Sequence, residues 1–215
     1  AIFESPRYDR FKMDDAGRAR LRARVDHEIS CIRDREALRR ASEGPAILQE
    51  RERQGWRGPV EGVGMPITRI VNTAIDAVSK RMTEVADDCA RYAASDLLCY
   101  RAEEPQRLVE RQSLHWDPVL VWAKDSHGWR FALAGGVVHI DQPEETCAAV
   151  RAHLHAVSDS LRLSALHVVT TMTGSVLLAL SLAEGAFGPT AIWNAAHVDE
   201  DVQMEIWGQD AEALE

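Results

Sequence analysis

The chain has 215 residues, 46% of them hydrophobic, and a formal net charge of −9. The hydrophobic fraction is ordinary for a globular protein and argues against global disorder, while the negative charge argues against a general nucleic-acid binder. Residues 1–64 carry 14 basic and 12 acidic side chains, whereas the last 17 residues carry seven acids and no Lys or Arg. We therefore expect an acidic surface at the end of the chain, with a solvating or partner-binding role.

The cysteines are scattered along the chain at Cys31, Cys89, Cys99 and Cys147, and none has Cys-x-x-Cys spacing. This arrangement, in a chain of this size, is typical of buried thiols in a reducing compartment. The first 15 residues lack an apolar core segment, so no secretory signal is expected.

Two domains are predicted. Residues 1–62 are rich in arginine, show little periodicity and are interpreted as a small N-terminal domain. Glycine and proline residues at 58–66 are typical of a linker. Residues 63–215 are predicted to form a larger, helical C-terminal domain.

Apolar residues recur at helical spacing from residue 66 onward. We predict helices, besides the apolar segment described next, over residues 66–82, 83–93, 105–116, 117–124, 143–157, 189–197 and 199–207. The break between the third and fourth helices is placed at Asp117-Pro118, with the Asp117 carboxylate capping the restart. Short strands are predicted at 97–100, 129–133 and 137–140, the last two paired around Gly135-Gly136.

The segment Leu163–Ala183 is 21 residues long and contains no Asp, Glu, Lys or Arg. That length could cross a bilayer, which needs roughly 20 apolar residues. Polar residues are interspersed, however, and no aromatic or basic belt flanks both ends. We therefore predict a single buried helix around which the other helices pack.

Signatures of several enzyme classes are absent, since the chain contains no phosphate-binding loop, no His-Glu-x-x-His and no Gly-x-Ser-x-Gly. His197 and Glu200 are three residues apart, a spacing that places both on one helix face, and Asp201 is adjacent. This group could hold a divalent ion, so a metal-dependent enzyme is one hypothesis. The alternative is a solvated helix start.

Other polar residues have a structural interpretation. His153 and His155 are two residues apart, so on a helix they point to different faces and do not ligate together. His167 is interpreted as a hydrogen-bonded core histidine. Asp76 is interpreted as a buried partner of Arg69, with a partner-facing charge as the alternative.

Apolar residues alternate with acids near the end of the chain, where Met204, Ile206 and Trp207 are interleaved with Asp and Glu. Tryptophan is favoured at interface anchors, so a docking role and plain packing against the core both remain open.

Ordered motifs run through residues 65–69, 72–76, 96–103, 110–112, 115–118 and 200–208. They resemble the family of assembly chaperones of the F-type ATP synthase α subunit, found in mitochondria and α-proteobacteria. The resemblance covers residues 65–215. It implies an α+β protein, in which a small antiparallel β domain precedes a mainly helical one.

The resemblance also implies a function without catalysis, cofactor or metal. Such a protein binds the free α subunit of F-type ATP synthase and shields the surface that later meets the β subunit. It implies a monomer that neither binds nucleic acid nor inserts into membranes, located in the bacterial cytoplasm or, in a eukaryote, the mitochondrial matrix. The client-binding residues that it implies are Glu200, Gln203, Glu205, Trp207, Asp210 and Glu212.

Overall fold

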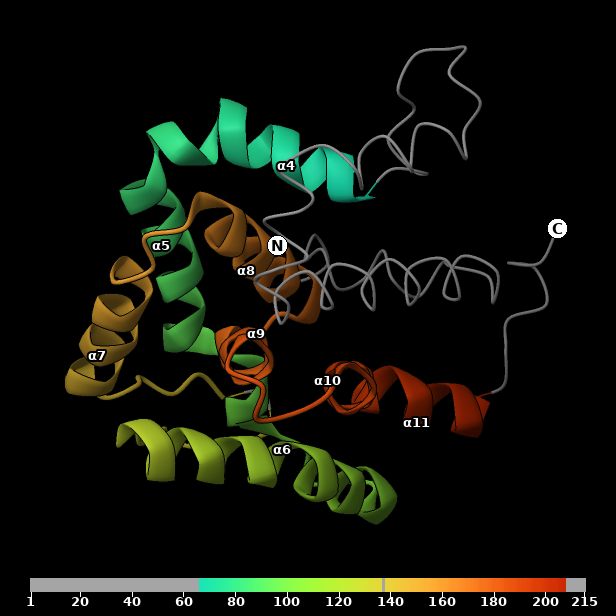
Figure 1. Ribbon diagram of the computed structural model, residues 1–215. Helices are drawn as coiled ribbons and strands as arrows, with labels where there is room; N and C mark the ends of the chain where they lie inside the picture. The colour runs from blue at the N-terminus through green and yellow to red at the C-terminus, as the bar shows by residue number, and fades with distance from the viewer. Residues whose placement is uncertain (1–65, 137, 208–215) are drawn as a thin grey trace, which may run out of the picture.

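The computed structural model (Figure 1) describes residues 66–136 and 138–207. The predicted N-terminal domain, residues 1–62, lies outside these residues, so the division into two domains stays a prediction. In the described part of the chain, the fold is mainly helical with one small sheet, which confirms the α+β prediction.

Helices make up most of the described residues. The α-helices are α4 (Pro66–Asp76), α5 (Met82–Arg91), α6 (Gln106–His127), α7 (Glu144–His155), α8 (Ser160–Thr173), α9 (Val176–Ala183), α10 (Pro189–Ala196) and α11 (Val198–Trp207). The 3-10 turns are η3 (Val78–Lys80), η4 (Tyr92–Ser95) and η5 (Leu97–Cys99). Strands β1 (Tyr100–Arg101) and β2 (Ala134–Gly135) pair in parallel. The sequence pattern therefore located the helices well, apart from where some of them end.

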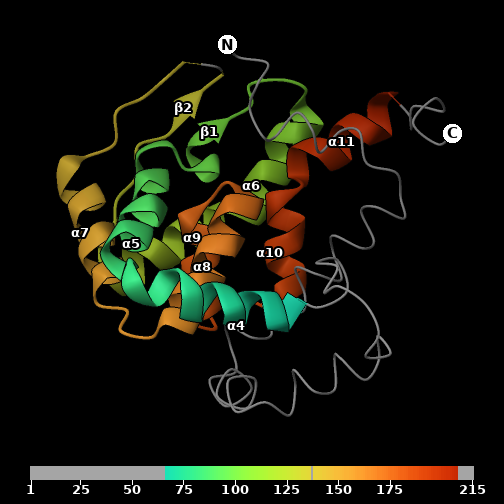
Figure 2. The same ribbon diagram turned by 90° about the horizontal axis from the view of Figure 1, so that it is seen from above.

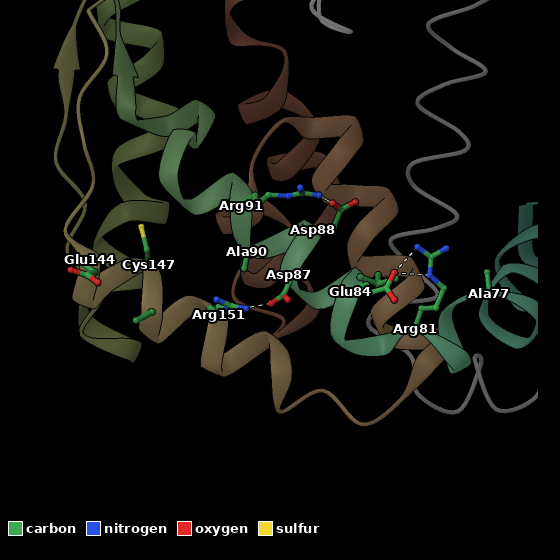
Figure 3. A pocket seen from close by; sticks show the side chains of 12 residues that line it. Ala77, Arg81, Glu84, Asp87, Asp88, Ala90, Arg91, Glu144, Cys147 and Arg151 are labelled. Atoms are coloured by element: carbon green, nitrogen blue, oxygen red, sulfur yellow. Dashed lines mark hydrogen bonds and ion pairs between the residues drawn. The ribbon is translucent and has the colours of Figure 1, made fainter.

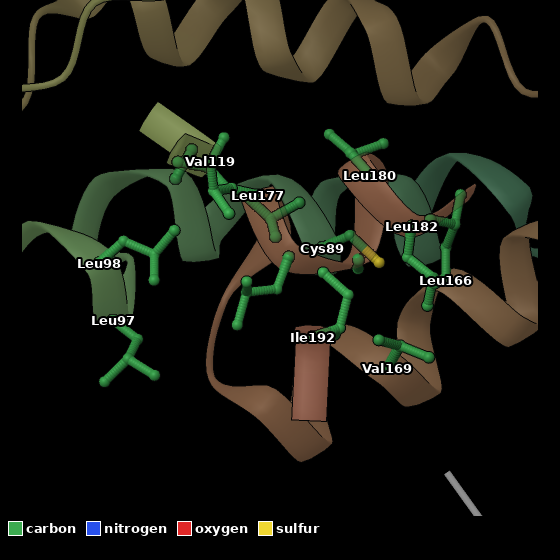
Figure 4. Close-up of a cluster of buried hydrophobic side chains, with 14 of the residues drawn as sticks. Cys89, Leu97, Leu98, Val119, Leu166, Val169, Leu177, Leu180, Leu182 and Ile192 are labelled. Carbon is green, nitrogen blue, oxygen red and sulfur yellow. The ribbon is translucent and has the colours of Figure 1, made fainter. Parts of the chain in front are cut away.

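Helices α8 and α9 occupy the centre of the molecule. They lie between α4 and α6 in Figure 1, with α5 and α7 on one side and α10 on the other, and Figure 2 shows the same arrangement from above. All seven residues from Val176 to Leu182 are buried. Figure 4 shows the leucines of α9 meeting Cys89 of α5, Val119 of α6 and Ile192 of α10. Each fully buried aliphatic side chain contributes about 1.5–3 kcal/mol to folding.

The prediction of one continuous helix over Leu163–Ala183 is wrong, because the segment forms two helices. Helix α8 ends at Thr173, and Gly174 follows with a left-handed backbone (φ 71°). Ser175 then caps α9 by accepting a hydrogen bond at Oγ from the Leu178 N–H, at 3.0 Å. Glycine adopts positive φ without steric cost, and serine is a favoured N-cap, so these two residues set the break. In the described part of the chain, no helix combines the length and apolarity that a bilayer crossing requires.

Substitutions at Gly174 should show this backbone requirement. We expect Gly174→Ala to lower the free energy of unfolding by about 1–2 kcal/mol, since a Cβ is disfavoured at positive φ. Gly174→Asn should cost less, because Asn tolerates the left-handed region better than other residues with a side chain. Urea denaturation of both variants measures the difference. Equal losses for Ala and Asn would show that the backbone conformation is not the cause.

A buried carboxyl joins the start of α9 to η5. Asp96 is fully buried, and its two oxygens accept hydrogen bonds from the Leu98 N–H (3.1 Å) and the Leu177 N–H (3.2 Å). Burial raises the pKa of Asp96 to about 6, against the opposing effect of the Ser175 hydroxyl and the backbone N–H groups. Asp96 therefore caps two helical segments that are distant in sequence.

Helix α6 corrects a second prediction. It runs unbroken from Gln106 to His127 with Pro118 inside it, so the predicted junction at Asp117-Pro118 is wrong. Proline removes one hydrogen bond from a helix interior and normally costs about 3 kcal/mol. Here Trp116 and Val119, on either side of it, are buried in the core and hold the helix together, while Pro118 itself is exposed.

The strand predictions are largely wrong. Residues 97–99 form η5, and only Tyr100 of the predicted first strand is extended. The predicted hairpin at 129–133 and 137–140 does not form; Val137 lies outside the described residues, and β2 pairs instead with β1. The backbone at Ala132 is satisfied by the side chain of Gln142, which accepts from its N–H (2.8 Å) and donates to its C=O (2.9 Å). A side chain thus replaces the expected partner strand.

Candidate functional site

Helix α11, which carries the predicted client-binding residues, packs against the first half of α6. The Glu205 carboxylate forms ion pairs with Arg107 and Arg111 of α6, the latter at 2.9 Å. These side chains are between 33% and 56% exposed, so each pair contributes no more than about 1 kcal/mol. Glu205 therefore orients α11 on α6 and is not a free surface acid.

A buried side-chain amide, that of Gln112, anchors the N-terminal end of α11. Gln112 of α6 accepts from the Ala102 N–H through Oε1 at 2.7 Å and donates to Asp199 through Nε2 at 2.8 Å. It is 2% exposed, so losing either partner would leave a buried polar atom unpaired. Gln112 thus links the residue after β1 to the first turn of α11.

Trp116 links α6 to α10 in the same region. Its indole is 1% exposed, and Nε1 donates to the Ala195 C=O at 2.7 Å. The guanidinium of Arg101 lies over the indole ring, 5.4 Å from its centroid, and also pairs with Asp117. These residues belong to the motifs that carry the family resemblance, and their role here is to build the platform for α10 and α11.

A surface with exposed apolar side chains extends along α6 from its contact with α11. Leu114 and Val121 are 69% and 54% exposed. Arg107, Leu114 and Val121 are spaced seven residues apart along α6. Seven residues are two helical turns, so these side chains share one face. Ile206 of α11 is 49% exposed. We define the α6–α11 surface as Arg107, Leu114 and Val121 of α6 together with the exposed residues Gln203, Glu205 and Ile206 of α11.

The predicted client-binding residues are placed as follows. Gln203 and Glu205 are exposed on α11, and Glu200 is half-buried in its first turn. Trp207 is the last residue of α11, but its side chain, together with Asp210 and Glu212, lies outside the described residues. Sequence reasoning missed Leu114 and Val121, although their seven-residue spacing with Arg107 was visible.

The metal hypothesis at His197, Glu200 and Asp201 gains no support. His197 Nδ1 lies 2.9 Å from the Trp193 carbonyl, and its ring stacks on the Trp193 indole at 3.9 Å. Within the described ranges, these three side chains are not brought together as a ligand set. His197 therefore packs on Trp193 at the C-terminal end of α10.

The remaining polar predictions have mixed outcomes. His153 and His155 face different partners, Glu184 at 3.0 Å and Asp87 at 2.6 Å, which confirms that they point to different sides of the helix. His167 is half-buried, lies 3.2 Å from Asp88, and has its pKa lowered by burial. The prediction of a buried Asp76 is wrong, since that residue is exposed.

An open hollow of about 900 Å³ lies between α5 and α7 (Figure 3). Its three arginines are each paired with an acid of α5, in the pairs Arg81–Glu84, Arg91–Asp88 and Arg151–Asp87. Burial raises the pKa of Cys147, so this thiol stays protonated at neutral pH. The hollow therefore presents paired charges and an unreactive thiol.

Comparisons with known proteins agree with this fold. The family described as "ATP12 chaperone protein" matches residues 45–124. Atp12 from Paracoccus denitrificans is 32% identical, with a TM-score of 0.71 over 79% of this chain and 72% of that one. An Asp-to-Lys mutant of P. denitrificans Atp12p gives 31% identity and a TM-score of 0.70 over the same shares.

A further match is a protein of Agrobacterium tumefaciens described as a candidate chaperone. It is 49% identical, with a TM-score of 0.65. The match covers 70% of this chain and 56% of that protein's length. The fold and these matches define the class of protein as a helical domain of the chaperone type. The chain belongs to the ATP12 chaperone family. The resemblance is thereby confirmed, and the family match begins at residue 45, before the first motif that carried the resemblance.

Proposed function

We propose that the protein is a chaperone of ATP synthase assembly that binds the unassembled α subunit and performs no catalysis. Membership of the ATP12 family supports this proposal, since the family and one structural relative are described as chaperones. A subunit awaiting its partner exposes an apolar patch, and such patches aggregate unless they are covered. The protein covers that patch until the β subunit replaces it.

The observation that carries the proposal is the mixed character of the α6–α11 surface. Leu114, Val121 and Ile206 offer exposed apolar contacts beside an acidic helix. Apolar contacts supply affinity, while the acids speed encounter with basic groups on the client. A micromolar Kd, about −8 kcal/mol, protects the client and still yields to a larger α–β interface.

The predicted client-binding residues enter the proposal with two roles. Glu200, Gln203, Trp207, Asp210 and Glu212 are proposed to contact the client. Glu205 is proposed to act through its pairs with Arg107 and Arg111, by setting the position of α11. The proposed working form is a monomer in the bacterial cytoplasm or the mitochondrial matrix, as the family resemblance implies.

A binding experiment with the purified full chain and purified α subunit tests this proposal. We expect the chain to suppress light scattering by the α subunit on warming, and Leu114→Asp to weaken binding at least about tenfold. Leu133→Asp is the matched control, because Leu133 is also an exposed leucine (48%) but lies outside the α6–α11 surface. Absence of binding would reject the α-subunit client, and equal losses for the two variants would reject the α6–α11 surface.

A further inference from the structure

Three potential metal ligands from distant parts of the sequence converge on one point. His127 is the last residue of α6, His153 lies in the last turn of α7, and Glu184 follows α9. His127 Nε2 lies 2.9 Å from one Glu184 oxygen, and His153 Nε2 lies 3.0 Å from the other. All three ligand atoms lie within 4.8 Å of one another.

We propose that His127, His153 and Glu184 form a transition-metal site that takes Zn²⁺. Two imidazoles and one carboxylate are a ligand set that suits zinc, with a fourth position left for water. Zinc bonds of about 2.0–2.1 Å in tetrahedral geometry place ligand atoms roughly 3.3 Å apart. Each histidine nitrogen lies 2.9–3.0 Å from a different Glu184 oxygen, so small shifts of these side chains would seat one ion between them. This site does not depend on the proposed chaperone function.

The two imidazole rings are held in place by tryptophans. Trp129 is 5% exposed and stacks on His127, with centroids 4.1 Å apart and planes at 13°. Trp129 also makes a T-shaped contact with the His153 ring, with centroids 5.3 Å apart, and Trp122 makes one with His127, with centroids 5.1 Å apart. Rings fixed by packing lose little freedom when they bind an ion, so the site is pre-organised.

The three side chains are partly shielded from solvent. The side chains of His127, Glu184 and His153 are 16%, 24% and 36% exposed. Arg162 is the nearby positive charge, and its guanidinium is directed to the Ala183 carbonyl at 3.4 Å.

Binding would tie the ends of three helices together. Without an ion, each histidine Nε2 lies 2.9–3.0 Å from a Glu184 oxygen, and these contacts already link α6, α7 and the end of α9. A metal ion would replace these two contacts with stronger bonds and stabilise the folded state by mass action. The proposed role of the ion is therefore to stabilise the junction of α6, α7 and the end of α9.

A titration of the metal-free full chain with Zn²⁺, in competition with a chromophoric chelator, tests the site. We expect one tight equivalent in the wild type, weakened at least about tenfold by His153→Gln and by Glu184→Gln. His155→Gln is the matched control, since it removes a histidine of the same helix that pairs with Asp87 instead. Circular dichroism of each variant reports whether it is folded.

Thermal unfolding of the wild type with and without Zn²⁺ gives a second readout that needs no variant. A higher midpoint with Zn²⁺, lost in Glu184→Gln and kept in His155→Gln, supports the site. A wild type that binds Zn²⁺ no more tightly than His153→Gln and Glu184→Gln overturns it, as does an unchanged midpoint. No client is present in these experiments, so their failure leaves the chaperone proposal standing.

Discussion

Replacing Trp116 by Ala is expected to lower the free energy of unfolding by about 3–5 kcal/mol. The indole is 1% exposed in the core, so the substitution leaves a large cavity. It also removes the N–H that pairs with the Ala195 carbonyl, leaving that acceptor buried and unpaired. Urea denaturation followed by circular dichroism measures the loss.

Two companion variants separate the causes. Trp116→Phe keeps most of the ring but not the N–H, so we expect an intermediate loss of about 1–3 kcal/mol. Leu114→Ala, two residues earlier on the same helix, should change stability by less than about 0.5 kcal/mol because that side chain is 69% exposed. If Leu114→Ala were as damaging as Trp116→Ala, the burial pattern assigned to α6 would be wrong.

Reversing the charge of Glu205 is expected to weaken client binding more than it lowers the stability of the fold. In Glu205→Lys, the ammonium meets Arg107 and Arg111, so two attractions become repulsions and α11 shifts on α6. Stability should fall by only about 1 kcal/mol, since the pairs are partly exposed. Affinity for the α subunit should fall at least about tenfold, or 1.4 kcal/mol, measured by calorimetric titration.

A charge exchange distinguishes the two ways in which Glu205 could act. The triple variant Arg107→Glu, Arg111→Glu, Glu205→Arg restores the ion pairs with opposite polarity. If Glu205 positions α11, this variant recovers most of the affinity; if Glu205 touches the client, it does not recover. Glu110→Lys is the control and should bind the α subunit normally. It also reverses a charge on α6, but Glu110 accepts a hydrogen bond from Gln106 and not from an arginine of this cluster.

The candidate site was predictable from the sequence only in part. The motifs at residues 96–103, 110–112 and 115–118 identified the family, yet their chemistry is structural: Gln112 and Trp116 hold α10 and α11 in place. The sequence showed that the end of the chain is acidic. It did not show that Glu205 forms ion pairs with α6, because its partners lie 94 residues or more away in the chain. Likewise, no spacing rule brings His127, His153 and Glu184 together.

Local signals determined what the sequence alone could establish. Apolar periodicity located most helices, and motif order indicated the ATP12 family. The tertiary structure decided the features in which distant residues compete with local preference. Helix α6 continues through Pro118 because its buried neighbours Trp116 and Val119 are held by the core. Ala132 has no strand partner because the side chain of Gln142 satisfies its backbone, and β2 pairs with the distant β1. These contacts join residues that only folding brings together, so no local pattern encodes them.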